Sequence, residues 1–423
     1  MELKKYKLSD IAKVEISSVD KKTKAGETPV RLCNFTDVYH NWAITSDMIG
    51  TFMEASANTN EIEKFTIKKG QVAFTKDSET RDDIGIPTYI ADDFNNVLLG
   101  YHCALITPDE TKLCGKYLNV FMHSAYIQKY FENSASGSGQ RYTLSLETLE
   151  SMPLLLPSLA EQKRIGEIFT SLDKKIELNR AINQNLEAMA KQLYDYWFVQ
   201  FDFPNEEGKP YKSSGGTLKF DEDSKRNIPA KWNTHNLNEY LEIKSGFPFK
   251  SDTYTESGIY RVVTIKNVQD GYLDLNGCDC LNEVPEKAKD WIRLKIGDRL
   301  ISLTGNCGRL CVVTAENLLL NQRVGLLSCG KTELEYFYMM MLSEQFQNLC
   351  QYLANGAAQA NLSPVELCKC KILIPPEDVL LGFNKLITPL RKAYIQNSQQ
   401  NAQLMNQREI LLPLLINGQV NIK

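Results

Sequence analysis

Two long stretches of the chain have the apolar period of coiled-coil helices. The first, 159–198, contains no proline, and positions seven residues apart form a ladder: Ile165, Leu172, Asn179, Leu186 and Leu193. The same spacing recurs later in the chain and gives a second ladder: Phe383, Leu390, Asn397, Leu404 and Leu411. Other apolar residues of the first stretch fill the seam between the rungs: Ile168, Ile176, Met189 and Trp197. This seven-residue repeat predicts two helices, 159–198 and 377–416, packed as a coiled coil.

The only polar rung of each ladder lies near the middle of its helix. If the two helices pack antiparallel about a pseudo-twofold axis, Asn179 meets Asn397. A buried pair of asparagines lowers stability but fixes register and orientation. The alternative is that the two are unrelated surface residues, but their matched position favours the pair.

The duplication extends to the segments between the helices, with a period of slightly more than half the chain. Segment 65–74 corresponds to 292–301, and in both a glycine precedes an apolar, strand-like run. Segment 135–145 corresponds to 354–363, which is one residue shorter. A long period of this kind predicts a fused duplication. Each half is expected to be a globular domain followed by a long helix.

Each globular half is predicted to be mixed. Short aliphatic runs between Gly, Asn and Asp indicate strands at 97–99, 104–106, 261–265 and 311–313. One amphipathic helix is expected in each half, near 115–132 and 333–353. The fold class is therefore α+β: two similar mixed α/β domains joined by two long helices that form an antiparallel coiled coil. The predicted boundaries are 1–157, 158–200, 201–375 and 376–423.

Composition narrows the class of protein. The 423 residues include 48 Lys and Arg against 52 Asp and Glu, a net charge of −4. This balance argues against strong stand-alone binding of nucleic acid, but it allows a local basic patch or help from basic partners. The apolar runs are far shorter than the ~20 residues of a membrane span, and the N-terminus lacks the pattern of a secretory signal. We therefore expect a cytoplasmic protein that does not bind a membrane.

Neither the cysteines nor the glycine-rich motifs indicate catalysis. The eleven cysteines include no pair with the two-residue spacing of a zinc knuckle, and there are four histidines. We expect reduced, buried thiols and no metal site. Segment 325–332, GLLSCGKT, matches a phosphate-binding loop letter for letter, but its Leu-Leu-Ser-Cys is itself strand-like. The sequence is that of a reader or a scaffold, not of a catalyst.

A resemblance to a known family begins at the first long helix. Segment 154–165, LLLPSLAEQKRI, with Ile168 and 172–176, resembles the start of the helix in specificity subunits of type I restriction–modification systems. Features that resemble this family's target-recognition domains are the Gly70 and Gly297 segments, the turn 304–308, and the Gly-x-x-Gln loops 137–140 and 356–359. The ordered set occurs twice and covers the whole chain. The second helix departs from the pattern, because it opens with Pro-Pro-Glu-Asp and lacks Glu-Gln.

The resemblance implies a specific function. Such a subunit recognises a bipartite, asymmetric sequence in double-stranded DNA, and each recognition domain reads one half. It recruits two methyltransferase subunits, which modify adenine with S-adenosylmethionine, and restriction subunits, which use ATP and Mg²⁺. No cofactor is then expected in this subunit, since catalysis belongs to its partners.

The residues expected to contact DNA lie in the polar loops of each domain. Those of the first domain are Ser136, Gly137, Gly139, Gln140 and Arg141. Those of the second are Asn355, Gly356, Gln359 and Asn361, with Thr304, Asn306, Arg309, Asn321, Gln322 and Arg323 as further candidates. An amide suits an adenine edge and a guanidinium suits guanine, while the same groups also suit phosphate. The alternative is a glycine turn whose glutamine caps backbone groups. Lys76 and Arg81 are interpreted as a solvated face.

Two other functions remain open from the residues alone. One is a non-enzymatic coiled-coil scaffold with two protein-binding heads. The other is an orphan DNA-recognition subunit. Co-purification of a methyltransferase would distinguish the main interpretation from the scaffold.

Overall fold

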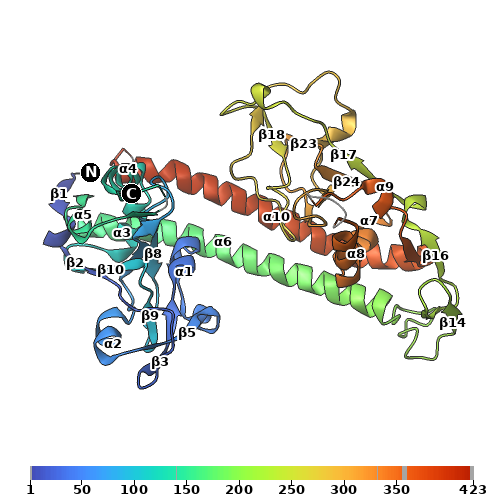
Figure 1. Ribbon diagram of the computed structural model, residues 1–423, viewed down its shortest axis with the longest axis horizontal. Coiled ribbons are helices and arrows are strands. Elements are labelled where there is room, and N and C mark those ends of the chain that lie inside the picture. The colour runs from blue at the N-terminus through green and yellow to red at the C-terminus, as the bar shows by residue number, and fades with distance from the viewer. Residues whose placement is uncertain (1, 140, 331, 355–359, 420–423) are drawn as a thin grey trace. The chain divides into compact units, whose positions relative to one another are not determined.

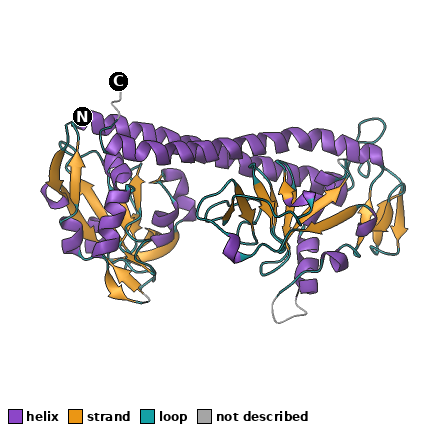
Figure 2. Cartoon of the chain, turned by 90° about the horizontal axis from the view of Figure 1, so that it is seen from above, coloured by secondary structure: helices purple, strands orange, loops and turns teal. Residues whose placement is uncertain are grey.

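The computed structural model describes residues 2–139, 141–330, 332–354 and 360–419. The chain forms two compact units (Figure 1). Unit 1 comprises Met1–Glu177 with Gln403–Lys423, and unit 2 comprises Leu178–Ala402. We call the part of each unit outside the long helices head 1 and head 2. Both heads contain strands and short helices (Figure 2).

Head 1 is built around a five-stranded sheet in the order β2-β10-β6-β8-β4. These strands are β2 (Ala12–Ile16), β10 (Cys103–Pro108), β6 (Val72–Thr75), β8 (Pro87–Ile90) and β4 (Ala43–Ile44). A second sheet contains β5 (Met53–Ala57), β3 (Thr28–Cys33) and β9 (Val97–Leu99), and a third contains β11 (Ser136–Ser138), β12 (Arg141–Thr143) and β7 (Asp77–Ser78). β1 (Lys4–Lys7) pairs with β13 (Pro153–Leu156). The helices are α1 (Phe35–His40), α2 (Thr59–Phe65), α3 (Gly115–Met122), α4 (Ala125–Ser134) and α5 (Leu146–Glu150).

Head 2 repeats the central pairings of head 1. One sheet has the order β17 (Leu241–Ser245), β24 (Val324–Cys329), β21 (Arg299–Ser302) and β22 (Leu310–Val312). Another has the order β19 (Cys280–Leu281), β18 (Tyr260–Val263), β23 (Leu318–Leu320) and β20 (Arg293–Leu294). The remaining pairs are β14 (Leu218–Asp221) with β15 (Arg226–Pro229), and β16 (Asn233–Asn236) with β25 (Lys371–Ile374). The helices are α7 (Leu334–Met341), α8 (Glu344–Ala354) and α9 (Pro364–Leu367). The predicted α+β duplication is confirmed.

The amphipathic segment predicted as one helix in each head is two helices. In head 1, α3 ends at Met122 and α4 begins at Ala125, because the Ser124 hydroxyl accepts a hydrogen bond from the Ile127 backbone N–H. The equivalent break in head 2 separates α7 from α8, where the Ser343 hydroxyl accepts from the Phe346 N–H. A serine that caps a helix N-terminus favours a new start over continuation. Most aromatic and methionine side chains of these helices are in the core, but Tyr126 and Tyr352 are exposed.

The two predicted long helices are present. α6 runs from Leu159 to Tyr194 and continues as a π-helical turn, Asp195–Val199. α10 runs from Glu377 to Ile416. Within unit 1, α6 and α10 share an apolar cluster that contains Ile165, Phe169 and Leu415, and within unit 2 they share another that contains Trp197 and Phe383.

The ladder residues line the seam, with one exception among the positions between them. All ten predicted rungs are buried or half-buried. Met189, however, has 49% of its surface exposed, so its assignment to the seam is wrong. Ala190, one position later, is buried in its place. Because each residue turns an α-helix by about 100°, a shift of one position moves the side chain from the outer face to the seam.

The predicted contact between Asn179 and Asn397 is wrong by one helical turn. Asn397 Nδ2 donates to Asn183 Oδ1 (3.0 Å), and Asn179 Nδ2 donates to Gln400 Oε1 (2.8 Å) and Asn401 Oδ1 (2.9 Å). The seam therefore has a layer of amides where the seven-residue period indicated a single polar rung. Amides pair here because each side-chain donor needs an acceptor away from water.

The phosphate-loop motif of head 2 is part of a sheet. Residues 325–329 of the phosphate-loop motif form most of β24, which pairs antiparallel with β17 and β21. Backbone committed to a sheet cannot wrap a phosphate. Lys331 lies outside the described residues.

All eleven cysteines are free thiols and each is buried or half-buried. No helix within the described ranges is both long enough and apolar enough to span a membrane.

Candidate DNA-recognition surfaces

The predicted loop of head 1 is a hairpin that forms one edge of a small sheet. β11 pairs with β12, and β12 pairs with β7. Gly137 has a φ of 145°, and a Cβ at this position would lie 2.1 Å from the Arg141 carbonyl oxygen, so only glycine fits. Ser136, Gly139 and Arg141 are exposed on this hairpin. Gln140 lies outside the described residues.

A buried carboxylate, Asp77 on β7, organises the base of this hairpin. Its oxygens lie 2.7 Å from His102 Nδ1, 2.9 Å from Arg141 Nη2 and 3.0 Å from Lys76 Nζ. Burial alone would raise the pKa of Asp77, but hydrogen bonds from His102, Thr143, Lys76 and Arg141 hold it well below its usual range. The carboxylate stays ionised and fixes the side chains of Lys76, His102 and Arg141. Arg141 remains 60% exposed. The result is an oriented, basic surface.

The interpretation of Lys76 and Arg81 as a solvated face is wrong for Lys76. Its side chain is 16% exposed and is held against Asp77. Arg81 is exposed, but its guanidinium lies 5.1 Å from the ring centre of Tyr142 on β12. Both residues therefore belong to the hairpin surface. They are far from the hairpin along the chain, and only strand pairing brings them together.

In head 2 the predicted residues come from three chain segments that pair side by side. The Leu303 N–H donates to the Arg323 carbonyl (2.9 Å), and the Leu362 N–H donates to the Leu303 carbonyl (2.7 Å). Thr304 is bridged to Asn361. The backbone thus gathers most of the predicted set: Thr304, Asn306, Asn321, Gln322, Arg323 and Asn361.

The side chains of this group differ in exposure. Thr304 is buried, and the Asn321 side chain accepts a hydrogen bond from the Arg323 N–H (3.1 Å) and so stabilises the turn. The other four side chains are exposed: those of Asn306, Gln322, Arg323 and Asn361. Three amides and a guanidinium that face solvent are suited to base edges or phosphates.

One predicted residue of head 2 faces a different loop. Arg309 Nη1 donates to Gln269 Oε1 (2.9 Å), and its Nε lies 3.3 Å from Asp270 Oδ2. The next residue, Gly271, accepts a hydrogen bond from the Tyr394 hydroxyl of α10. The guanidinium is therefore directed at the loop beside the helix. Asn355, Gly356 and Gln359 lie outside the described residues.

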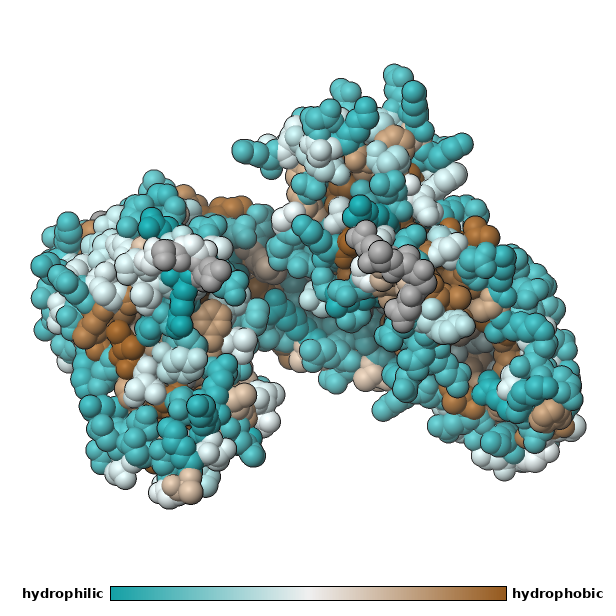
Figure 3. All heavy atoms as spheres, in the orientation of Figure 1, coloured by the Kyte–Doolittle hydropathy of each residue, from teal (hydrophilic) through white to brown (hydrophobic). Residues whose placement is uncertain are grey.

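Sequence reasoning missed two residues of head 1, Asp77 and His102. A carboxylate is an unexpected component of a DNA-binding surface, and neither residue stands in a recognisable motif. A signal was present in the repeat, because Asp77 occupies the position of the predicted Thr304 when 65–74 is matched to 292–301. The visible face of both heads is mainly hydrophilic, as Figure 3 shows.

Comparison with known proteins places the chain in a family. The family model described as type I restriction modification DNA specificity domain matches residues 2–188 and 229–403. The type I restriction enzyme HindI specificity subunit of Haemophilus influenzae is 23% identical over 408 residues, covering 84% of this chain and 88% of that protein. The MjaIX specificity subunit of Methanocaldococcus jannaschii is 25% identical over 318 residues, covering 73% and 69%.

A solved structure supports the fold. The S subunit of a type I restriction–modification system from M. genitalium aligns with a TM-score of 0.57 and 14% identity, covering 100% of this chain and 97% of that one. The repeated family match, at two places and in the order that the duplication predicts, covers well over half of the chain. The chain therefore belongs to the family of type I restriction–modification specificity subunits.

Proposed function

We propose that this subunit binds a bipartite, asymmetric sequence in double-stranded DNA, and that each head reads one half. The observation that carries the proposal is the pair of recognition surfaces, which have one backbone plan and different side chains. Head 1 presents Arg141 and His102 around a buried Asp77. Head 2 presents exposed amides, among them Asn361, around Thr304, which carries no charge. Different donors and acceptors at matched positions favour two different half-sites.

The test uses the full subunit assembled with its methyltransferase subunits. Arg141→Ala should weaken recognition of one half-site, and Asn361→Ala should weaken the other. A bidentate guanidinium or amide contact contributes roughly 1–3 kcal/mol of discrimination against the wrong base. The measurement is binding to duplexes that differ by one base pair at a time, together with genome-wide mapping of N6-methyladenine.

The matched control is Lys225→Ala, which removes an exposed cation of unit 2 away from the predicted loops. It should leave both half-sites intact. The two-reader proposal is refuted if either recognition-surface substitution changes the recognised bases of both half-sites together. It is also refuted if the methylated sequence has one continuous block.

We further propose that the long helices dock the methyltransferase subunits, with restriction subunits joining the assembly. An apolar stripe on the outer face of α6 supports this part: Leu178 is 54% exposed, Ile182 38% and Met189 49%. Their spacing of four and seven residues places them on one face of the helix. Exposed apolar side chains in a row are typical of a protein-binding surface.

Charged substitutions test this docking. Ile182→Lys with Met189→Lys should abolish co-purification of a methyltransferase while the isolated subunit still folds, as judged by its thermal unfolding. Gln184→Lys is the control, since it adds the same charge at an exposed polar position of α6. Retention of the partner by the double variant would contradict docking at this stripe and would leave an orphan subunit or another surface as the explanation.

The proposal assigns catalysis and its cofactors to those partners. S-adenosylmethionine would bind in the methyltransferase subunits, and ATP and Mg²⁺ in the restriction subunits. The placement of the phosphate-loop motif within an antiparallel strand supports this division. The purified subunit should not bind ATP. Binding that Lys331→Ala abolishes would contradict the proposal.

A further inference from the structure

A four-residue turn occurs at the same place in both heads, and its side chains differ completely. In head 1 it is Gly100-Tyr-His-Cys103, closed by a hydrogen bond from the Cys103 N–H to the Gly100 carbonyl (3.1 Å). In head 2 it is Asn321-Gln-Arg-Val324, closed by the Val324 N–H and the Asn321 carbonyl (2.9 Å). Each turn leads from the short strand β9 or β23 into β10 or β24.

The first residue of each turn has the same backbone surroundings. The Gly100 N–H donates to the Cys33 carbonyl at the end of β3 (2.8 Å). The Asn321 N–H donates to the Val263 carbonyl at the end of β18 (3.1 Å). Parallel bridges also join Val19 to Gly100, and Phe247 to Asn321. Gly100 and Asn321 are thus equivalent.

The two central residues are equivalent for the same reason. The Tyr101 N–H donates to the Val19 carbonyl, and the Gln322 N–H donates to the Phe247 carbonyl, both at 3.0 Å. The His102 carbonyl accepts from the Lys76 N–H (3.0 Å), as the Arg323 carbonyl accepts from the Leu303 N–H (2.9 Å). Tyr101 therefore matches Gln322, and His102 matches Arg323.

The turn of head 1 lies directly beside a predicted recognition surface, and the turn of head 2 is part of one. His102 reaches the hairpin of head 1 through Asp77 and Arg141, whose Nη2 is 2.8 Å from His102 Nδ1. The Tyr101 ring lies against His102, with 3.7 Å between the ring centres, and 37% of Tyr101 is exposed. In head 2, Gln322 and Arg323 are both exposed. The same backbone position thus offers aromatic rings in one head and hydrogen-bond donors in the other.

We propose that the two central residues of this turn, Tyr101–His102 in head 1 and Gln322–Arg323 in head 2, are a pair that determines base specificity in each half-site. The inference rests on the proposed function. A turn fixed by four backbone hydrogen bonds gives the side chains a defined direction without dictating their identity. Gln and Arg match the donor and acceptor edges of purines, whereas the Tyr101 ring matches the methyl group of thymine by apolar contact.

The experiment uses the full subunit in complex with its methyltransferase subunits. Arg323→Ala and Tyr101→Ala are compared with wild type on a panel of duplexes that carry every single-base change in each half-site. Arg323→Ala should lower discrimination by about tenfold or more at one or two base pairs of the head 2 half-site. Tyr101→Ala should do so only in the head 1 half-site. Controls are Arg293→Ala and Tyr126→Ala, exposed residues of the same types elsewhere on the heads.

Conservative variants separate recognition from folding. Tyr101→Phe keeps the ring and should retain thymine preference, while Arg323→Lys keeps the charge but loses the bidentate geometry and should lose discrimination. A loss of affinity that is equal for all sequences would identify phosphate contacts and overturn the inference. Unchanged discrimination in both alanine variants would also overturn it.

The outcomes for this turn and for the proposed function are distinguishable. If Arg141→Ala and Asn361→Ala each alter one half-site but the turn variants alter none, the two-reader function stands and the turn is structural only. If the wild-type complex shows no bipartite preference, the proposed function itself fails.

Discussion

The two units attach a head to the same pair of helices by different chemistry. In unit 1 the Trp42 ring stacks on His123, with 4.2 Å between ring centres, and lies 6.2 Å from Phe169 of α6. The guanidinium of Arg408 on α10 lies 4.7 Å from the centre of the Trp42 ring. The contact is therefore an aromatic stack covered by one cation, an arrangement that is stabilising when the cation is partly desolvated.

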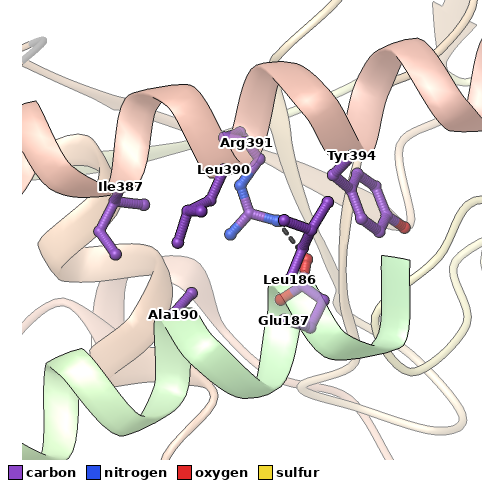
Figure 4. Close-up of a pocket in the computed structure, with 7 residues that line it drawn as sticks. All are labelled: Leu186, Glu187, Ala190, Ile387, Leu390, Arg391 and Tyr394. Carbon is purple, nitrogen blue, oxygen red and sulfur yellow. Dashed lines mark hydrogen bonds and ion pairs between the residues drawn. The ribbon is translucent and has the colours of Figure 1, made fainter. Parts of the chain in front are cut away.

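In unit 2 a network of buried charges joins head 2 to the helices. Arg391 of α10 pairs with Glu187 of α6 and approaches Glu335 of α7 at 3.5 Å, and Glu335 also pairs with Arg299 (Figure 4 shows the first pair). Glu335 is 6% exposed and Arg391 5%. Burial disfavours the charge on Arg391, but the facing carboxylates raise its pKa further above the usual value.

Both attachments place an arginine of α10 over an aromatic ring of the head. Arg391 lies 4.8 Å from the centre of the Tyr338 ring, as Arg408 does over Trp42. The two attachments differ in the side chains packed around that ring, which are aromatic in unit 1 and charged in unit 2. The duplication that repeats the heads therefore does not fix the chemistry by which each head contacts its helices.

The largest effect is expected where a buried charge loses its partner. Glu335→Ala leaves Arg299 and Arg391 facing each other without a shared carboxylate, and should destabilise unit 2 by roughly 3–5 kcal/mol. Thermal unfolding with hydrogen exchange resolved by head measures the change. Glu344→Ala, at an exposed position of the adjacent α8, is the control. If unit 1 lost protection as strongly as unit 2, the two attachments would not be independent.

The aromatic attachment should be less sensitive to truncation. Trp42 is half-buried, so Trp42→Ala should destabilise unit 1 by roughly 2–3 kcal/mol, less than a fully buried aromatic residue. Trp42→Phe keeps part of the stack and should recover about half of the loss. The same exchange measurement checks both variants. A larger loss than that of Glu335→Ala would reverse the ranking of the two attachments.

Lowering the pH should also separate the stabilities of the two units, but by less than either of these substitutions. Burial and the charge of Arg408 lower the pKa of His123 from 6.5 to about 3. The unfolded chain then binds a proton that the folded chain does not, so this residue causes stability to fall as the pH decreases from about 6.5 towards 3. The repeat places Leu342 at the equivalent position of head 2, because α3 and α7 end one residue earlier. His123→Leu should reduce the loss of unit 1 stability between pH 7 and pH 5. An identical pH profile would show that His123 is not buried in its neutral form.

The smallest effect is expected at the amide layer of unit 2. Asn397→Leu leaves the Asn183 Oδ1 without its donor and should destabilise the unit by about 1 kcal/mol. Asn183→Leu with Asn397→Leu removes both partners. The double variant should be as stable as the wild type or about 1 kcal/mol more stable, and the orientation of its helices should be specified less strictly. Asn185→Leu, at an exposed position of α6, is the control. Additive losses in the double variant would contradict the pairing.

Much of the architecture follows from the sequence because it depends on period alone. A seven-residue ladder repeated at a fixed shift is sufficient to predict α6 and α10, and a repeat of 65–74 at 292–301 is sufficient to predict two similar heads. The period did not determine the register of the seam. Shifting an antiparallel helix by one turn keeps the same face towards its partner, so Asn179 could face either Asn397 or Asn401 until packing of the whole unit selected the second.

The recognition surfaces were determined only in part by sequence. The hairpin residues from Ser136 to Arg141 and the turn from Asn321 to Arg323 stand out as polar loops that contain glycine or amides. Asp77 and His102 do not, because each acquires its role only when β7 and β10 bring it within hydrogen-bonding distance of Arg141. The equivalence of Tyr101–His102 with Gln322–Arg323 has no trace in residue identity. It exists only in backbone hydrogen bonds between segments that are far apart in the chain, and every residue except proline can donate such a bond whatever its side chain.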